Sequence, residues 1–265
     1  MTGITVLTLY AVAAVFLARS VLSERGKHID LLVGVFAGIA GFLLHASYVY
    51  ESISGTDWSP GIADTASLIG LAITFVALLA ATRPAYRGIA ALLIGVAALF
   101  ALATGSGPAG TPPVAGGWQL KAHILLSVFA YTIMSIATAL AVLHTWQQRR
   151  LKSKHPGGLN RLLPPLETTE RFFFGTMGFG WGLLSLAIFS GLVFVDDLFA
   201  QHLAHKTTLS LLAWVVFGLV LLGHRLFGWR GQRAAGLTIA GFAFLALAYF
   251  GSKIVLEILL QRHWG

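Results

Sequence analysis

Long apolar stretches alternate with short polar connections along almost the whole chain. An α-helix needs about 20 predominantly apolar residues to cross about 30 Å of hydrocarbon. Eight stretches reach roughly that length: 4–22, 31–50, 62–81, 88–104, 120–146, 172–195, 206–226 and 234–260. The pattern predicts an all-α polytopic membrane protein, a bundle of eight transmembrane helices. We take residues 1–265 as a single integral membrane domain.

The composition strengthens this prediction and excludes several classes of protein. Of the 265 residues, 57% are hydrophobic and only 11% are charged, which excludes an ordinary soluble domain. Cysteine is absent, so the chain has no disulfide framework and no thiolate ligand of its own. The sequence contains no zinc-protease, nucleophile-elbow or phosphate-loop motif, which favours a protein that is not an enzyme.

The net charge of +8 is compatible with nucleic acid binding, but the placement of the basic residues argues against it. Fourteen of the 18 lysines and arginines lie in the connections after the first, third, fifth and seventh stretches or in the last residues of those stretches. The connections at 51–61, 105–119 and 196–205 are acidic or neutral. By the positive-inside rule, these three connections and both termini lie outside. The charges therefore indicate membrane topology, and the partner that they predict is the lipid bilayer.

Two histidines stand at the start of apolar stretches in similar surroundings. His123 lies in W-Q-L-K-A-H-I-L-L-S and His205 in L-A-H-K-T-T-L-S, and each has a lysine close by, Lys121 or Lys206. Ionisable groups at a membrane edge are energetically unfavourable and therefore point to function. Both histidines lie on the predicted outer side. They either cap their helices near the lipid headgroups, or they are the two axial ligands of one haem iron, with the lysines paired to its propionates.

Three further histidines fall inside predicted helices or at their ends. His45 lies late in the second stretch, on the same predicted side. It is either a third group of the haem pocket or a hydrogen-bond partner of a neighbouring helix. His144 and His224 end their helices on the predicted inner side. They either interact favourably with the helix C-terminus as cations, or they are the ligands of a second, inner haem.

Five blocks of the C-terminal half are distinctive as sequences. They are WQLKAHILLSVFAY from 118, LPPLETTERFFF from 163, DDLFAQHLAHKT from 196, GWRG from 228 and GFAFLALAYFGSKIVLE from 241. Together they resemble the cytochrome c assembly protein family, the relatives of CcsA, CcmC and HemX, and most closely its YpjD-like inner membrane branch. The best-matching region is 118–260. The resemblance implies a haem-handling protein of the bacterial inner membrane, with haem b as its cofactor.

The resemblance also bears on individual residues. It implies that His123 corresponds to an outer histidine that ligates external haem in haem-binding relatives. It implies that His224 corresponds to the intramembrane histidine of the synthetases. The synthetases and haem-delivery relatives carry a W-W-D type motif in the outer loop before the seventh helix, whereas this loop has no tryptophan. Aromatic stacking on haem by the loop is therefore lost, and His205 is proposed as a replacement for the second external ligand.

Three functions are compatible with these observations. The first is a membrane factor of cytochrome c assembly or haem handling, which binds haem near the outer face without being a full haem lyase. Its implied partners are other cytochrome assembly proteins or an apocytochrome. The second is a cofactor-free membrane regulator or accessory subunit that retains the fold. The third is a haem lyase or exporter, which the missing tryptophans disfavour.

Overall fold

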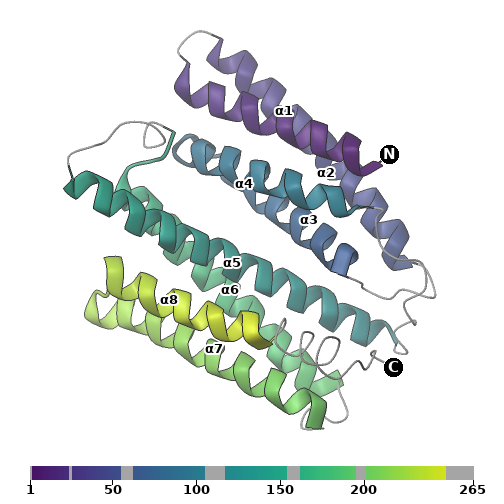
Figure 1. The fold of residues 1–265 in the computed structure, drawn as a ribbon, viewed down its shortest axis with the longest axis vertical. Coiled ribbons are helices and arrows are strands. Elements are labelled where there is room, and N and C mark those ends of the chain that lie inside the picture. Colours follow the sequence, from purple (N-terminus) through teal and green to yellow (C-terminus); the bar gives the residue numbers. More distant parts are fainter. Residues whose placement is uncertain are drawn as a thin grey trace. The chain divides into compact units, whose positions relative to one another are not determined.

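The secondary structure of the protein is helical throughout the part that the computed structural model describes, residues 2–23, 26–54, 62–104, 117–153, 162–194 and 201–248 (Figure 1). No strand occurs in these ranges, which confirms the predicted all-α fold class. The helices are α1 Thr2–Leu22, α2 Lys27–Ser54, α3 Ile62–Ala81, η1 Pro84–Tyr86, α4 Arg87–Phe100, η2 Ala101–Ala103, α5 Trp118–Lys152, α6 Leu166–Phe194, α7 Gln201–Phe227 and α8 Gly231–Ala246.

Seven helical segments of the described residues are long and apolar enough to cross a membrane, as a multi-pass protein requires, and one of them is the continuous run Pro84–Ala103 of η1, α4 and η2. The eighth, α8, ends at Ala246, and residues 249–260 of the predicted stretch 234–260 lie outside the described residues. Many large apolar side chains point away from the packed interior, among them Phe36 at 69% exposure and Phe189 at 65%. Such surfaces suit contact with lipid rather than water. The sides on which the termini lie stay a prediction.

Several helices differ in length from the apolar stretches that predicted them. α5 was expected at 120–146 but continues to Lys152, because its last turns carry polar and basic side chains that extend to the headgroups. The stretch 88–104 is divided, since α4 ends at Phe100 and the tighter η2 follows. Hydropathy therefore predicts the part of a helix that lies in the hydrocarbon layer. It does not predict the turns by which a helix such as α5 continues beyond that layer.

The chain forms two compact units, and each is described by itself. The first comprises Met1–Ala115 and His155–Thr168, and the second comprises Gly116–Lys154 and Thr169–Gly265. In the first unit, α1 packs against α2 and α4, and α3 packs against the same two helices. Gly41 of α2 allows close approach, because a Cβ there would lie 2.8 Å from the Tyr10 ring. The single integral domain stays a prediction.

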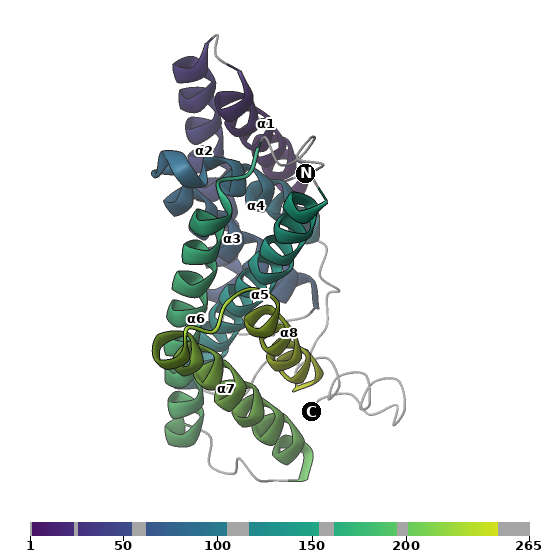
Figure 2. The ribbon, with the colours of Figure 1, turned by 90° about the vertical axis from the view of Figure 1, so that its left-hand side faces the viewer.

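In the second unit, α8 packs along both α5 and α7, as Figures 1 and 2 show. α6 and α7 are joined by two stacked indoles, Trp181 and Trp214, whose ring centroids lie 5.2 Å apart. The Trp214 Nε1–H donates to Ser185 Oγ at 2.7 Å. In return, the Trp181 Nε1–H donates to the Trp214 carbonyl at 3.0 Å. These reciprocal bonds fix the register of α6 against α7. The register in turn positions the side chains at both ends of the two helices relative to one another.

Candidate functional site

The His123 imidazole is half-buried near the start of α5 and is held by α6. Its Nδ1 lies 2.8 Å from Ser190 Oγ. The Ser190 hydroxyl also lies 2.9 Å from the Ala187 carbonyl, and when it donates its single proton there, Oγ accepts from the imidazole. We assign this arrangement, in which Nδ1 of His123 carries the proton and Nε2 keeps its lone pair.

The backbone of α6 also shapes the space around this ring. Gly191 is buried, and a Cβ at that position would lie 3.1 Å from His123 Cε1, tighter than ordinary contact. The absence of a side chain lets the imidazole lie against the helix. Neither Ser190 nor Gly191 was singled out from the sequence, where a serine–glycine pair inside an apolar helix carries no local signal.

The second predicted ligand, His205, lies in the first turns of α7, but its side chain is outside the described residues. The next residue, Lys206, is half-buried and close enough to His123 to act on it electrostatically. Further along, Tyr131 of α5 and Ser210 of α7 share a hydrogen bond of 3.1 Å. The structure thus brings the start of α7 to the His123 end of α5, and the pairing of His123 with His205 stays a prediction.

His45 occupies a different setting, in the interior of the first unit. Its ring is fully buried, and Nδ1 lies 3.1 Å from the Tyr10 hydroxyl. Nε2 lies 2.8 Å from Ser67 Oγ and 3.2 Å from Thr104 Oγ1. Both ring nitrogens are therefore engaged by hydroxyls from neighbouring segments. Either nitrogen would have to leave a hydroxyl before it bound iron.

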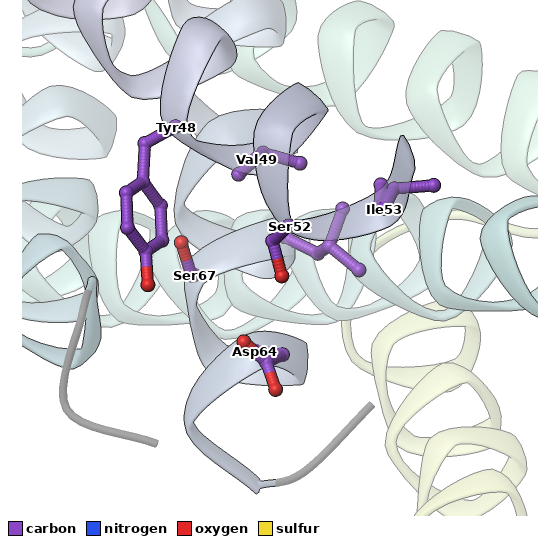
Figure 3. A pocket seen from close by; sticks show the side chains of 7 residues that line it. Tyr48, Val49, Ser52, Ile53, Asp64 and Ser67 are labelled. Carbon is purple, nitrogen blue, oxygen red and sulfur yellow. The ribbon is translucent and has the colours of Figure 1, made fainter. Parts of the chain in front are cut away.

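A small pocket adjoins this histidine between α2 and α3 (Figure 3). Its cavity volume of about 10 Å³ is near the lower limit for one water molecule, so it is far too small for a haem. Ser67 is common to the pocket and to the His45 hydrogen bonds. The lining residues are Tyr48, Val49, Ser52, Ile53, Asp64, Ser67 and Leu68.

At the other end of α7, His224 resembles His123 in its hydrogen bonding. Its Nδ1 lies 2.9 Å from the Trp229 carbonyl, which can only accept, so Nδ1 carries the proton and Nε2 keeps its lone pair. The ring stacks on Phe174 of α6, with centroids 3.5 Å apart. His144 of α5 is 4% exposed, and its buried Nε2 has no hydrogen-bond partner.

Among the described residues, no group of three or more histidine, aspartate or glutamate side chains is placed to hold a metal ion. A metal site made of protein ligands alone is therefore not found in that part of the chain. An iron that is already held by a porphyrin has a simpler requirement, since the protein supplies only one or two axial ligands. His123 and His224 present the nitrogen that this role uses.

Comparison with known proteins shows the family of the chain. The family described as Cytochrome C assembly protein matches residues 4–260. The chain belongs to the cytochrome c assembly protein family. The match includes the first four helices as well as the region 118–260 in which the sequence blocks lie. No solved structure matches the chain significantly.

Individual relatives point to the same family. An uncharacterized 28.8 kDa protein of Azospirillum brasilense is 33% identical over 231 residues, 84% of each chain. The inner membrane protein YpjD of Escherichia coli strain K12 is 39% identical over 137 residues, 52% of each chain. The cytochrome c biogenesis protein CcsA of Guillardia theta is 26% identical over 170 residues, 58% of this chain and 56% of that one. The matched part is thus only about half the length of the YpjD and CcsA relatives.

Proposed function

We propose that this protein binds haem b at the His123 end of its second unit, as a membrane factor of cytochrome c assembly rather than a full haem lyase. The observation that carries the proposal is the hydrogen bond from His123 Nδ1 to Ser190, which leaves Nε2 with a lone pair. Histidines that bind metals almost always donate their other ring N–H to an acceptor, which fixes the tautomer and the ring orientation.

The surrounding residues have the chemistry that a haem requires. His123 supplies one axial nitrogen, and His205, on the helix whose start lies near His123, is the proposed second ligand. Lys121 and Lys206 are both half-buried near this end and are suited to pair with propionate carboxylates. The haem, when bound, supplies a redox-active iron. The chain orients the imidazole and provides positive charge.

The same residues explain why we do not propose a haem lyase or exporter. The sequence of the loop that precedes α7 contains no tryptophan, so it lacks the large aromatic rings that stack well on a porphyrin. Binding and presentation of haem are separate tasks, and only the first has support in these residues. We place the protein in the bacterial inner membrane, as for the YpjD relatives, with both termini outside and with an apocytochrome or another assembly protein as its partner.

The test is an optical spectrum of the full chain purified from haem-replete cells. We expect a Soret band that loses the absorbance of one haem per chain in His123→Ala and keeps its full absorbance in a control, His28→Ala, which changes an exposed histidine at the start of α2. A colourless wild-type protein, or a Soret band that survives His123→Ala unchanged, would refute haem binding at this site. A colourless protein would instead favour the cofactor-free regulator or accessory subunit.

A second haem near His224 has a separate observation in its favour. The bond from His224 Nδ1 to the Trp229 carbonyl leaves Nε2 available, and His144 has an unpartnered buried Nε2. We propose this histidine pair as the ligands of an inner haem. The haem content per protein should then fall from about two to about one in His224→Ala. A wild-type content of one haem, unchanged in that variant, would exclude the second site.

A further inference from the structure

The turn between α7 and α8 is built to hold one conformation. Gly228 and Gly231 have φ values of +64° and +59°, which side-chain-bearing residues rarely adopt. Between them, the Trp229 N–H donates to the Gly223 carbonyl at 3.1 Å. The Trp229 carbonyl accepts from His224 Nδ1 at 2.9 Å. Both backbone groups of Trp229 are therefore bound to α7, and the turn is rigid.

The Trp229 ring is fixed together with the turn. It packs directly on Gly223, where an added Cβ would overlap the ring. The Arg233 guanidinium lies 5.6 Å from the centroid of the same ring, within the range of a cation–π interaction. The turn thus fixes the position of the Trp229 indole and of the Arg233 guanidinium relative to each other.

Basic side chains gather around this turn. Arg225, Arg230 and Arg233 are exposed, and we call these three residues the basic turn. A Cβ at Gly231 would lie 3.4 Å from the Gln148 amide, so the basic turn lies beside the last turn of α5. That last turn adds three exposed cations, Arg149, Arg150 and Lys152.

Few described negative charges offset this concentration of positive charge. Glu170 lies 3.6 Å from Arg230 Nε, and Arg230 remains 71% exposed. Within the described residues, no ion pair engages the guanidinium groups of Arg225 or Arg233. Six like charges at the end of one group of helices repel one another unless anions lie against them.

We propose that the basic turn binds the phosphate headgroup of an anionic phospholipid. The turn joins the end of a membrane-spanning helix to the next helix. It is therefore expected at the depth of the lipid headgroups. Guanidinium groups recognise phosphate oxygens through paired hydrogen bonds. A lipid is favoured over free phosphate because its acyl chains reach the apolar helices beside the turn, where Leu226 is 65% and Phe227 is 72% exposed.

The variant that tests this is Arg225→Ala/Arg233→Ala, which leaves the Arg230–Glu170 pair intact. The matched control is Arg83→Ala/Arg87→Ala, which removes two arginines from the turn after α3, in the first unit. The probes are dioleoyl phosphatidylglycerol and dioleoyl phosphatidylcholine, titrated into the full chain in detergent and measured by native mass spectrometry. Thermal unfolding of each variant checks that it is folded, and Arg225→Gln/Arg233→Gln replaces the alanine variant if that one unfolds.

We expect phosphatidylglycerol to bind wild type and control tightly and to bind the basic-turn variant about 25-fold more weakly, since each arginine contributes about fivefold. Equal losses in both double variants would show that the effect is diffuse charge rather than a site. Equal binding of phosphatidylcholine would overturn the requirement for an anion. Displacement of phosphatidylglycerol by millimolar inorganic phosphate would overturn the choice of a lipid over a free phosphate.

Discussion

Ser190→Ala is the substitution that most directly tests how the structure prepares His123 for haem. It removes the hydroxyl oxygen that accepts from His123 Nδ1 at 2.8 Å and leaves the rest of α6 unchanged. The imidazole then loses its hydroxyl partner and keeps the backbone contact with the Ala187 carbonyl. Nε2 remains present, so haem binding should weaken rather than disappear.

The expected size of the effect follows from the type of bond that is lost. A neutral hydrogen bond contributes about 0.5–1.5 kcal/mol to stability, whereas outer-shell partners of metal-binding histidines typically change affinity about 10–100-fold. We expect haem affinity to fall within that second range, because the bond also orients the ligand. Gly191→Ala should have a smaller effect, because the His123 ring has to move by only a few tenths of an ångström from a Cβ at 3.1 Å.

The assay is a haem titration of the apoprotein, followed at the Soret band, for wild type, Ser190→Ala and His123→Ala. The control is Ser135→Ala on α5, which removes a serine with the same kind of bond to its own helix, to the Thr132 carbonyl at 2.7 Å. If Ser190→Ala binds haem as tightly as wild type while His123→Ala binds one haem fewer, the positioning argument is wrong even though the ligand is right.

Three further substitutions test the packing, each by thermal unfolding of the purified protein in detergent. His45→Ala should destabilise by about 3 kcal/mol, since it leaves a cavity and removes the ring nitrogens that bond the hydroxyls of Tyr10, Ser67 and Thr104, and a loss under 1 kcal/mol would contradict this. Trp214→Phe should lose about 1–2 kcal/mol with the bond to Ser185 and part of the indole stacking, and an unchanged melting temperature would argue against the α6–α7 lock. Gly231→Ala should lose about 1 kcal/mol through its positive φ, whereas a gain would show that the turn adopts another conformation.

The helices of this protein were predictable because the bilayer sets their length. A stretch such as 62–81 has the hydropathy and the length of one crossing, and α3 is observed as Ile62–Ala81. The ends were less predictable, because polar side chains continue a helix into the headgroup region without any apolar signal. The change from α4 to η2 at Ala101 has no counterpart in hydropathy either.

The sequence predicted individual residues of the candidate site but not the contacts between them. His123 stands out because an ionisable group at a membrane edge is unusual. Its partner Ser190 lies 67 residues away on another helix, and the contact depends on how α5 packs against α6. The same holds for His45, whose partners Tyr10 and Ser67 are 35 and 22 residues distant. Sequence spacing within one helix does not reveal contacts of this kind.

Hydrogen bonding separates histidines that composition alone treats alike. At His123 and His224, one nitrogen donates to a serine or carbonyl oxygen of the protein, and these bonds leave the other nitrogen for a ligand. At His45, hydroxyls engage both nitrogens, so the ring joins helices instead. An imidazole has only two ring nitrogens, so a histidine that links helices through both of them has none left for iron. The two uses exclude each other at any one position, which is why we select ligand candidates among the described histidines by the number of engaged nitrogens, more than by burial or membrane depth.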